Sequence, residues 1–195
     1  MEAGDNKDNK KKSPKKGKQG KSSSRWAVQV FFIAVTLSAA LSFASDQALD
    51  GAGLVVAFAV LLAFILLGIV FDVIGVSVTA ADEKPFHSMA ARKTPGAREA
   101  LNLIRKADKV SSFCNDVVGD ICGIISGSTG AVIVVQMQAA FSFLPMVVTS
   151  LAVTALTSGL TIGGKALGKS FAIAKSTAVL QLVGRILHLF SHKKR

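Results

Sequence analysis

Two hydrophobic stretches of this chain carry polar and acidic side chains at positions where a membrane helix would be apolar. The first stretch holds Asp72 and Ser77 near its end, and a later one holds Asn115, Asp116 and Asp120. Ionisable groups are costly in hydrocarbon, so they indicate an ion path, a substrate pocket or a contact between helices. Carboxylate, amide and hydroxyl oxygens are also the ligands that a hard cation such as Mg²⁺ takes.

The spacing of the acids predicts where they lie. Asp116 and Asp120 are four residues apart, which puts both on one face of a helix. At a rise of about 1.5 Å per residue, they and Asp72 lie roughly 10–15 Å in from the same end of their segments. We expect these carboxylates, with Asn115 and Ser77, to converge on one layer as a metal site. The simpler alternative is that the acids face a water-filled funnel at the membrane surface.

A lysine stands close to this layer on another hydrophobic segment. Lys165 follows Gly163-Gly164 at the expected cytoplasmic end of that segment. Its ammonium can extend to the lipid headgroups, or it can turn inward and neutralise Asp116 or Asp120. A buried carboxylate in a bilayer must pair or take a proton. The inward alternative therefore predicts a cation pocket that is already filled by an internal ammonium group.

The composition places the chain among membrane proteins. Its 195 residues are 50% hydrophobic and 18% charged, with a mean hydropathy of +0.48, whereas charged residues make up about a quarter of a soluble domain. The net charge of +11 does not indicate nucleic-acid binding, because no aromatic platform accompanies the basic residues. No nucleophile–base pair, phosphate loop or cofactor fingerprint is present, so we do not expect an enzyme.

We predict an all-α, polytopic membrane fold with a soluble tail. Residues 1–25 are basic and almost free of apolar side chains, so they should be a disordered cytoplasmic tail that contacts anionic lipid headgroups. Four segments then approach the ~20 residues that span a bilayer, and Gly75 is the expected break in the second. Glycines at the four-residue spacing of close helix packing recur in the third segment. The predicted segments are 26–44, 54–81, 117–140 and 143–162.

The loops predict the orientation. Residues 45–53 carry two acids and no basic residue, whereas residues 82–110 carry seven basic residues against four acids. The chain ends Lys193-Lys194-Arg195. The positive-inside rule then predicts a multi-pass protein with both termini in the cytoplasm. With no organelle signal, we expect the plasma membrane of a prokaryote, its inner membrane.

Two further segments are amphipathic at helical spacing and should lie in the plane of the membrane surface. One is residues 96–109, within a juxtamembrane helical segment at 82–110, and the other is residues 169–192. Together they would form a collar on the cytoplasmic face. The expected organisation is thus a tail, a transmembrane domain over 26–168, and an amphipathic C-terminal helix with a basic end over 169–195.

Short motifs follow one another over residues 54–192 in an order that is found in a known family. They are Gly75-Val76-Ser77-Val78-Thr79-Ala80, Gly96-Ala97-Arg98-Glu99-Ala100-Leu101, Cys114-Asn115-Asp116, and Gly164-Lys165-Ala166-Leu167-Gly168-Lys169-Ser170-Phe171-Ala172. This layout resembles the transmembrane domain of the CNNM/CorC magnesium-transporter family. That domain has a Ser-Gly-Ser-Glu-Thr-Ala break, a juxtamembrane helical stretch, a Gly-Asn-Asn helix start and a Gly-Glu-x-x-Pro-Lys-Ser-Leu-Ala end.

The resemblance implies a Mg²⁺ pocket with ligand positions at Ser77, Asn115 and Asp116, and a homodimer formed through this domain. The chain is divergent and has no CBS modules. Lys165 stands where the family has a glutamate, and Val78 replaces another glutamate. An ammonium group about 4 Å from a divalent cation repels it strongly at low dielectric.

These observations leave three functions open. The first is a cation transporter, or a descendant of one, with oxygen ligands from Asp72, Ser77, Asn115, Asp116 and Asp120 and with Lys165 as the gate or substitute for Mg²⁺. The second is a non-transporting scaffold that recruits a protein partner or anionic lipid. The third is a carrier for an anionic or lipid substrate that Lys165 contacts.

Overall fold

The described part of the chain folds into helices that stand side by side. The computed structural model describes residues 20–141, 143 and 145–192 and contains only helices and turns over those residues. Four of the helices are long and apolar enough to cross a membrane. The predicted all-α, polytopic membrane fold is therefore confirmed. The four candidate spans are Trp26–Leu49 within α1 (Gly20–Leu49), α2 (Leu54–Ala80), Ala107–Ala140, and α7 (Met146–Ala174).

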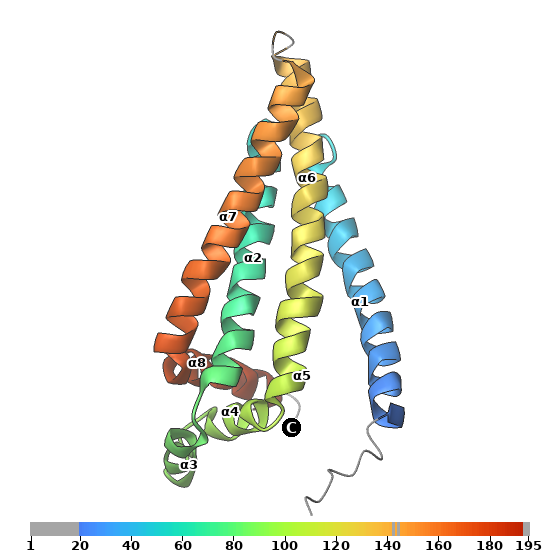
Figure 1. The fold of residues 1–195 in the computed structure, drawn as a ribbon. Coiled ribbons are helices and arrows are strands. Elements are labelled where there is room, and N and C mark those ends of the chain that lie inside the picture. The colour runs from blue at the N-terminus through green and yellow to red at the C-terminus, as the bar shows by residue number, and fades with distance from the viewer. Residues whose placement is uncertain (1–19, 142, 144, 193–195) are drawn as a thin grey trace, which may run out of the picture.

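The most apolar span occupies the centre of the bundle. Helix α2 packs against both α6 (Gly119–Ala140) and α7, and these three helices form the main bundle in Figure 1. Its residues Ala57, Leu61 and Ile65 form a buried cluster with apolar side chains of α6 and α7. Because α2 is apolar on all sides, it can be covered by neighbours on several faces.

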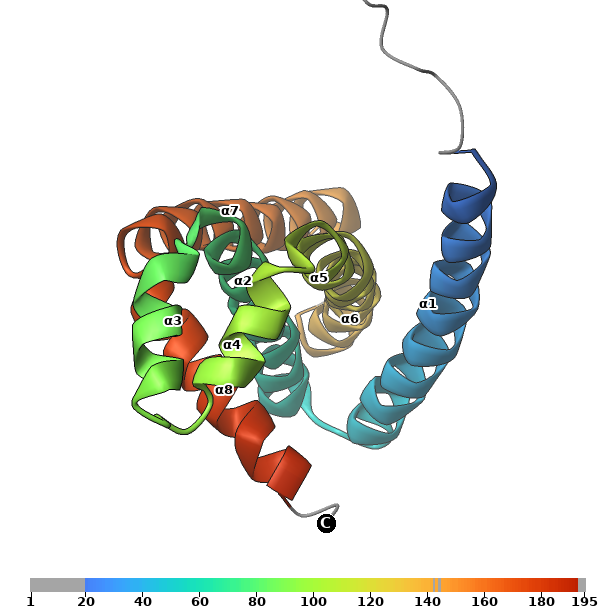
Figure 2. The ribbon, with the colours of Figure 1, turned by 90° about the horizontal axis from the view of Figure 1, so that it is seen from below.

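Helix α1 lies at the edge of the bundle. A stripe of small and branched residues on α1 packs against Ile121 and Ile125 of α6 and against Phe64 of α2, and Figures 1 and 2 show α1 standing apart from α7. Phe31, Phe32 and Phe43 are exposed on its outer side. These large apolar side chains match a helix whose surroundings are hydrocarbon rather than water.

Short helices gather at one end of the bundle, as the sequence pattern predicts (Figure 1). They are α3 (Glu83–Ala91), α4 (Ala97–Ile104) and α8 (Ser176–His192). The third span also begins here, with α5 (Ala107–Ser112) and a π-helical turn, η1 (Phe113–Val118), that lead directly into α6. The beginning of α1 lies at the same end.

Several predicted boundaries are wrong. Helix α2 is continuous through Gly75, because a glycine lowers helix propensity but does not break a helix whose packing is good. The third helix begins before residue 117, at Ala107, and the fourth continues beyond residue 162 to Ala174. Both added stretches contain polar and charged residues, so the hydrophobic pattern of the sequence ended before the helices do. The predicted 96–109 helix is two helices, α4 and α5. Residues 1–19 of the predicted tail lie outside the described residues, whereas residues 20–25, predicted to be disordered, are the first residues of α1.

Helices α4 and α8 cross at two glycines. A Cβ on Gly184 would collide with the carbonyl oxygen of Gly96, and a Cβ on Gly96 would collide with the backbone of Gly184 and Arg185. Gly96 also has a φ of 85°, a left-handed conformation that side chains disfavour. Beside this crossing, His188 Nδ1 lies 2.8 Å from Glu99 Oε1. The collar is therefore a docked pair of helices.

The glycine crossing gives the first prediction. Gly184→Val should destabilise the protein by about 1–3 kcal/mol, because the new side chain has no space beside Gly96. Thermal unfolding of the detergent-purified protein measures the change. Gly163→Val is the matched control, since nothing lies within 4 Å of a Cβ at that position. Equal effects of the two substitutions would contradict the close crossing.

The ion pair gives a pH prediction. Burial raises the pKa of the Glu99 carboxyl, but its bonds to His188 and to its own backbone amide, and the charges of His188 and Arg98, lower it more, so the net pKa lies below the usual 4.5. A carboxyl with a depressed pKa stabilises the fold above its unfolded-state pKa and loses that contribution as the pH falls through its folded-state pKa. Glu99→Gln should therefore lower the melting temperature at pH 7, and the difference from the wild type should shrink below about pH 4. A constant difference would mean that the charge of Glu99 is not involved.

Candidate functional site

The structure buries one carboxylate inside a membrane-spanning helix. Asp72 lies on the inner face of α2 and is 4% exposed. Its Oδ2 atom has no hydrogen-bond partner and lies 4.0 Å from Nζ of Lys169 on α7. At that distance the two groups attract as charges without a direct hydrogen bond. The internal counter-charge of Asp72 is thus Lys169, a residue that the sequence analysis did not select.

Asn115 of the third span lies against α2 at Gly75. It lies in the π-helical turn η1, and its Oδ1 atom fills the space that a side chain at Gly75 would occupy. Its Nδ2 atom donates to Ser111 Oγ at 3.3 Å, while Oδ1 is buried and without a partner. Gly75 is therefore the position where η1 approaches α2 most closely, and it lies one helical turn, about 4.5 Å, from Asp72.

Ser77 joins α2 to the last turn of α7. Its side chain is 0% exposed, and its hydroxyl donates to the carbonyl oxygen of Ala172 at 3.4 Å. The carbonyl of Ala172 is near the end of α7, where helical carbonyls lack intrahelical partners. Ser77 is therefore buried, and its hydroxyl hydrogen already bonds to the backbone of α7.

The structure does not bring the other predicted acids into this layer. Asp116 and Asp120 are both exposed, and no ion pair joins either of them to Lys165 among the described residues. The hypothesis that Lys165 neutralises them is therefore not supported by this arrangement. Lys165 instead extends toward α6, where a Cβ on Gly119 would lie 3.4 Å from its Nζ atom. The physical reason is the π turn, which turns Asn115 inward and leaves Asp116 outside.

The oxygen donors that α2, η1 and α7 hold at the collar end of the bundle, here called the layer, carry little net charge. Asp72, Asn115, Ser77 and the carbonyl of Ala172 supply donors of the type that Mg²⁺ or Ca²⁺ takes. The Lys169 ammonium balances the only carboxylate among them. No group of three histidine, cysteine, aspartate or glutamate side chains that could hold a metal ion occurs among the described residues. The oxygen donors are therefore of the type that binds a hard cation. The net negative charge that such a cation needs is present only when the Lys169 ammonium moves away from Asp72.

Sequence reasoning found Asp72, Ser77 and Asn115 but missed two parts of the site. Lys169 carries a helical signal, because it follows Lys165 by four residues and so lies on the same face of α7. The expectation that α7 ended near residue 162 concealed that signal. The carbonyl of Ala172 has no signal in the sequence, since every residue has one.

No family model, curated protein or solved structure matches this chain. The similarity to the CNNM/CorC layout therefore depends on the order of the motifs, and it stays an expectation.

The contact between Asn115 and Gly75 gives a prediction about the layer itself. Gly75→Ala should destabilise the protein by about 1–3 kcal/mol, because the added methyl group overlaps the Asn115 amide. Asn115→Ala should relieve that overlap, so the double variant should be more stable than the sum of the two single changes predicts. Thermal unfolding of the three variants measures the coupling. Strict additivity would contradict the contact.

Proposed function

We propose that this integral membrane protein binds and transports a cation at the layer of Asp72, Asn115 and Ser77, with Lys169 as the internal cation that occupies the layer between binding events. The observation that supports this most directly is the pair of buried oxygens, Asp72 Oδ2 and Asn115 Oδ1, that have no hydrogen-bond partner. Such groups are costly to bury in hydrocarbon. A cation that bridges them would satisfy both.

The mobility of the internal charge supports exchange. The side chain of Lys169 is 54% exposed, whereas that of Asp72 is 5% exposed. A long lysine side chain can extend toward the membrane surface and leave the carboxylate behind. The buried carboxylate must then find another positive partner. A cation from solution and the Lys169 ammonium would compete for one site.

The chemistry of the donors favours a hard divalent cation, and the CNNM/CorC resemblance makes Mg²⁺ the first ion to test. One carboxylate with neutral amide, hydroxyl and carbonyl oxygens gives a weak site, because affinity for such ions rises with the number of charged ligands. Weak binding suits transport, in which the ion must also leave. We propose further that the end with α3, α4 and α8 faces the cytoplasm of a prokaryote, because the basic loop residues lie there.

The test is thermal unfolding of the detergent-purified chain with increasing Mg²⁺, Ca²⁺ and Mn²⁺. A ligand that binds the native state alone raises the apparent stability, by about 2.7 kcal/mol at 100 times its Kd. We expect a small rise for the wild type, a larger rise for Lys169→Gln because the competitor is gone, and none for Asp72→Asn.

Lys175→Gln is the matched control for this experiment. It removes a positive charge from the exposed turn after α7 and does not touch Asp72, so it should behave as the wild type. Choline chloride at equal ionic strength controls for screening. Absence of any metal-dependent shift in Lys169→Gln would overturn the proposal.

A second function is favoured by one feature of the site. The Asp72 and Lys169 charges balance each other, and the remaining donors are neutral, which suits a permanently closed layer. The protein would then be a non-transporting membrane scaffold whose collar recruits a protein partner or anionic lipid. In that case Lys169→Gln should lower the stability in metal-free buffer, and divalent cations should not restore it.

A further inference from the structure

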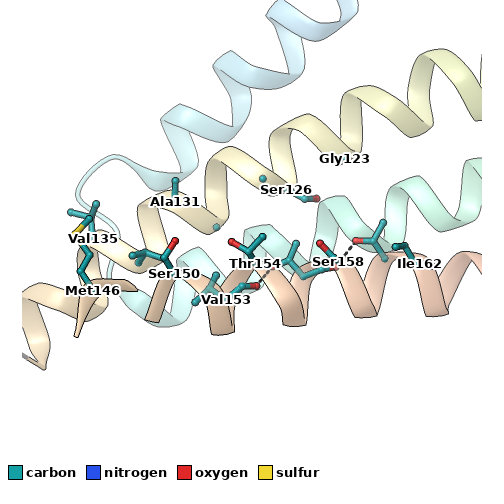
Figure 3. Close-up of a pocket in the computed structure, with 15 residues that line it drawn as sticks. Gly123, Ser126, Ala131, Val135, Met146, Ser150, Val153, Thr154, Ser158 and Ile162 are labelled. Atoms are coloured by element: carbon teal, nitrogen blue, oxygen red, sulfur yellow. Dashed lines mark hydrogen bonds between the residues drawn. The ribbon is translucent and has the colours of Figure 1, made fainter. Parts of the chain in front are cut away.

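A second polar region lies outside the layer just described. A groove with a volume of about 480 Å³ runs between α6 and α7, toward the turn that joins them. Figure 3 shows its two walls, with Gly123, Ser126 and Val135 on α6 and Ser150, Thr154 and Ser158 on α7. Its volume lies in the range of small-molecule sites, which are mostly apolar with a few polar groups.

The wall on α6 is open because it is built from glycine. Nothing lies within 4 Å of a Cβ at Gly123 or Gly127. At Gly130 the two helices meet, since a Cβ there would lie 3.6 Å from Val153 Cγ1. The groove therefore has a floor near Gly130 and Val153, and it is free along the two glycines.

The wall on α7 carries hydroxyl groups that are free to bond. Ser150, Thr154 and Ser158 follow one another by four residues, are exposed, and make no hydrogen bond among the described residues. Serine and threonine in membrane helices usually bond to their own backbone. Thr157 and Thr161 do so, with 2.8 Å bonds to the carbonyls of Val153 and Thr157.

A buried hydroxyl on the other wall also lacks a partner. Ser126 is 2% exposed, lines the groove, and its Oγ atom makes no hydrogen bond. Buried hydroxyls nearly always have a partner. An acceptor atom of a bound molecule would supply one here.

An unpaired ammonium group lies at the end of the groove nearer the collar. Lys165 follows Thr161 by one turn of α7, and its Nζ atom lies against Gly119, one turn before Gly123 on α6. It makes no ion pair among the described residues. A cation inside a membrane-spanning helix needs a counter-ion, and no carboxylate lines the groove.

The α6 wall of the groove is long enough for an extended hydrocarbon chain. From residue 123 to residue 135 it measures roughly 18 Å, and the lining is mostly apolar, with hydroxyl groups along the α7 side. A single acyl chain can therefore lie along the groove.

We propose that the α6–α7 groove binds an anionic phospholipid with a single acyl chain. Its phosphate pairs with Lys165, its glycerol lies over Gly123, its ester carbonyl accepts from Ser126, and its chain continues over Gly127. This direction places the headgroup nearer the membrane surface and the chain toward the bilayer centre, as in the surrounding lipid. The site is independent of the proposed cation layer, because neither Asp72 nor Lys169 lines it.

The experiment is native mass spectrometry of the full chain, delipidated in detergent and titrated with monoacyl phosphatidic acid. We expect one retained lipid per chain. Lys165→Gln should weaken retention at least about tenfold, because a charge-assisted bond is lost. Gly127→Leu should abolish retention by filling the groove. Equal retention by either variant and the wild type would overturn the proposal.

Matched variants and probes separate the alternatives. Gly159→Leu places the same side chain on α7 at a position with open space outside the groove lining, and Lys169→Gln alters the cation layer. Both variants should retain the lipid.

Two other ligands test the headgroup and the acyl chain. Monoacyl phosphatidylcholine should bind more weakly, and inorganic phosphate should not displace the lipid. Equal binding of the zwitterionic lipid, or displacement by phosphate, would overturn the assignment. If Gly127→Leu does not fold, Lys165→Gln decides.

Discussion

The burial of one carboxylate constrains the end of the bundle that carries the collar. Asp72 is 4% exposed within a membrane-spanning helix, and a bare carboxylate in hydrocarbon is too costly to persist. Its counter-charge comes from Lys169, which is present at that depth only because α7 continues to Ala174. The extension of α7 to Ala174 therefore supplies both the counter-charge of Asp72 and the carbonyl of Ala172, to which Ser77 of α2 donates a hydrogen bond.

The π turn in the third span is the second element of that arrangement. A regular helix would present the side chains of residues 113–118 at 100° steps, whereas the wider turn shifts their directions. In η1 the result is that Asn115 lies against Gly75 while Asp116 is exposed. π turns of this kind are rare and often occur at functional sites. Here it selects an amide rather than a carboxylate for the interior, which keeps the negative charge of the layer low.

The sequence was sufficient for the fold class and for part of the site. Long apolar stretches fix the four candidate spans, and the charges around residues 82–110 separate them from the collar. Asp72, Ser77 and Asn115 were recognised because polar residues in such stretches are rare. The exposed positions of Asp116 and Asp120 fit the simpler alternative, in which these acids lie outside a metal site. The inward position of Asn115 beside Gly75 was not predictable, because the sequence carries no signal for the π-helical turn of residues 113–118. The role of Lys169 was missed because polar residues such as Lys165 made α7 look shorter than it is.

The charged residues at the collar end of the bundle differ in whether they point into the bundle or away from it. Asp116 and Asp120 lie on the outside of the third span, while Asp72 lies inside and Lys165 extends to Gly119 between α6 and α7. Two ammonium groups of α7 and one carboxylate therefore lie near the interior, and Lys169, although half-exposed, compensates the charge of Asp72. Lys165 is left without a partner, at the point where the glycine and hydroxyl walls of the α6–α7 groove begin. A cation layer and an anion-binding groove can thus coexist along α7, because each uses a different lysine, one helical turn apart.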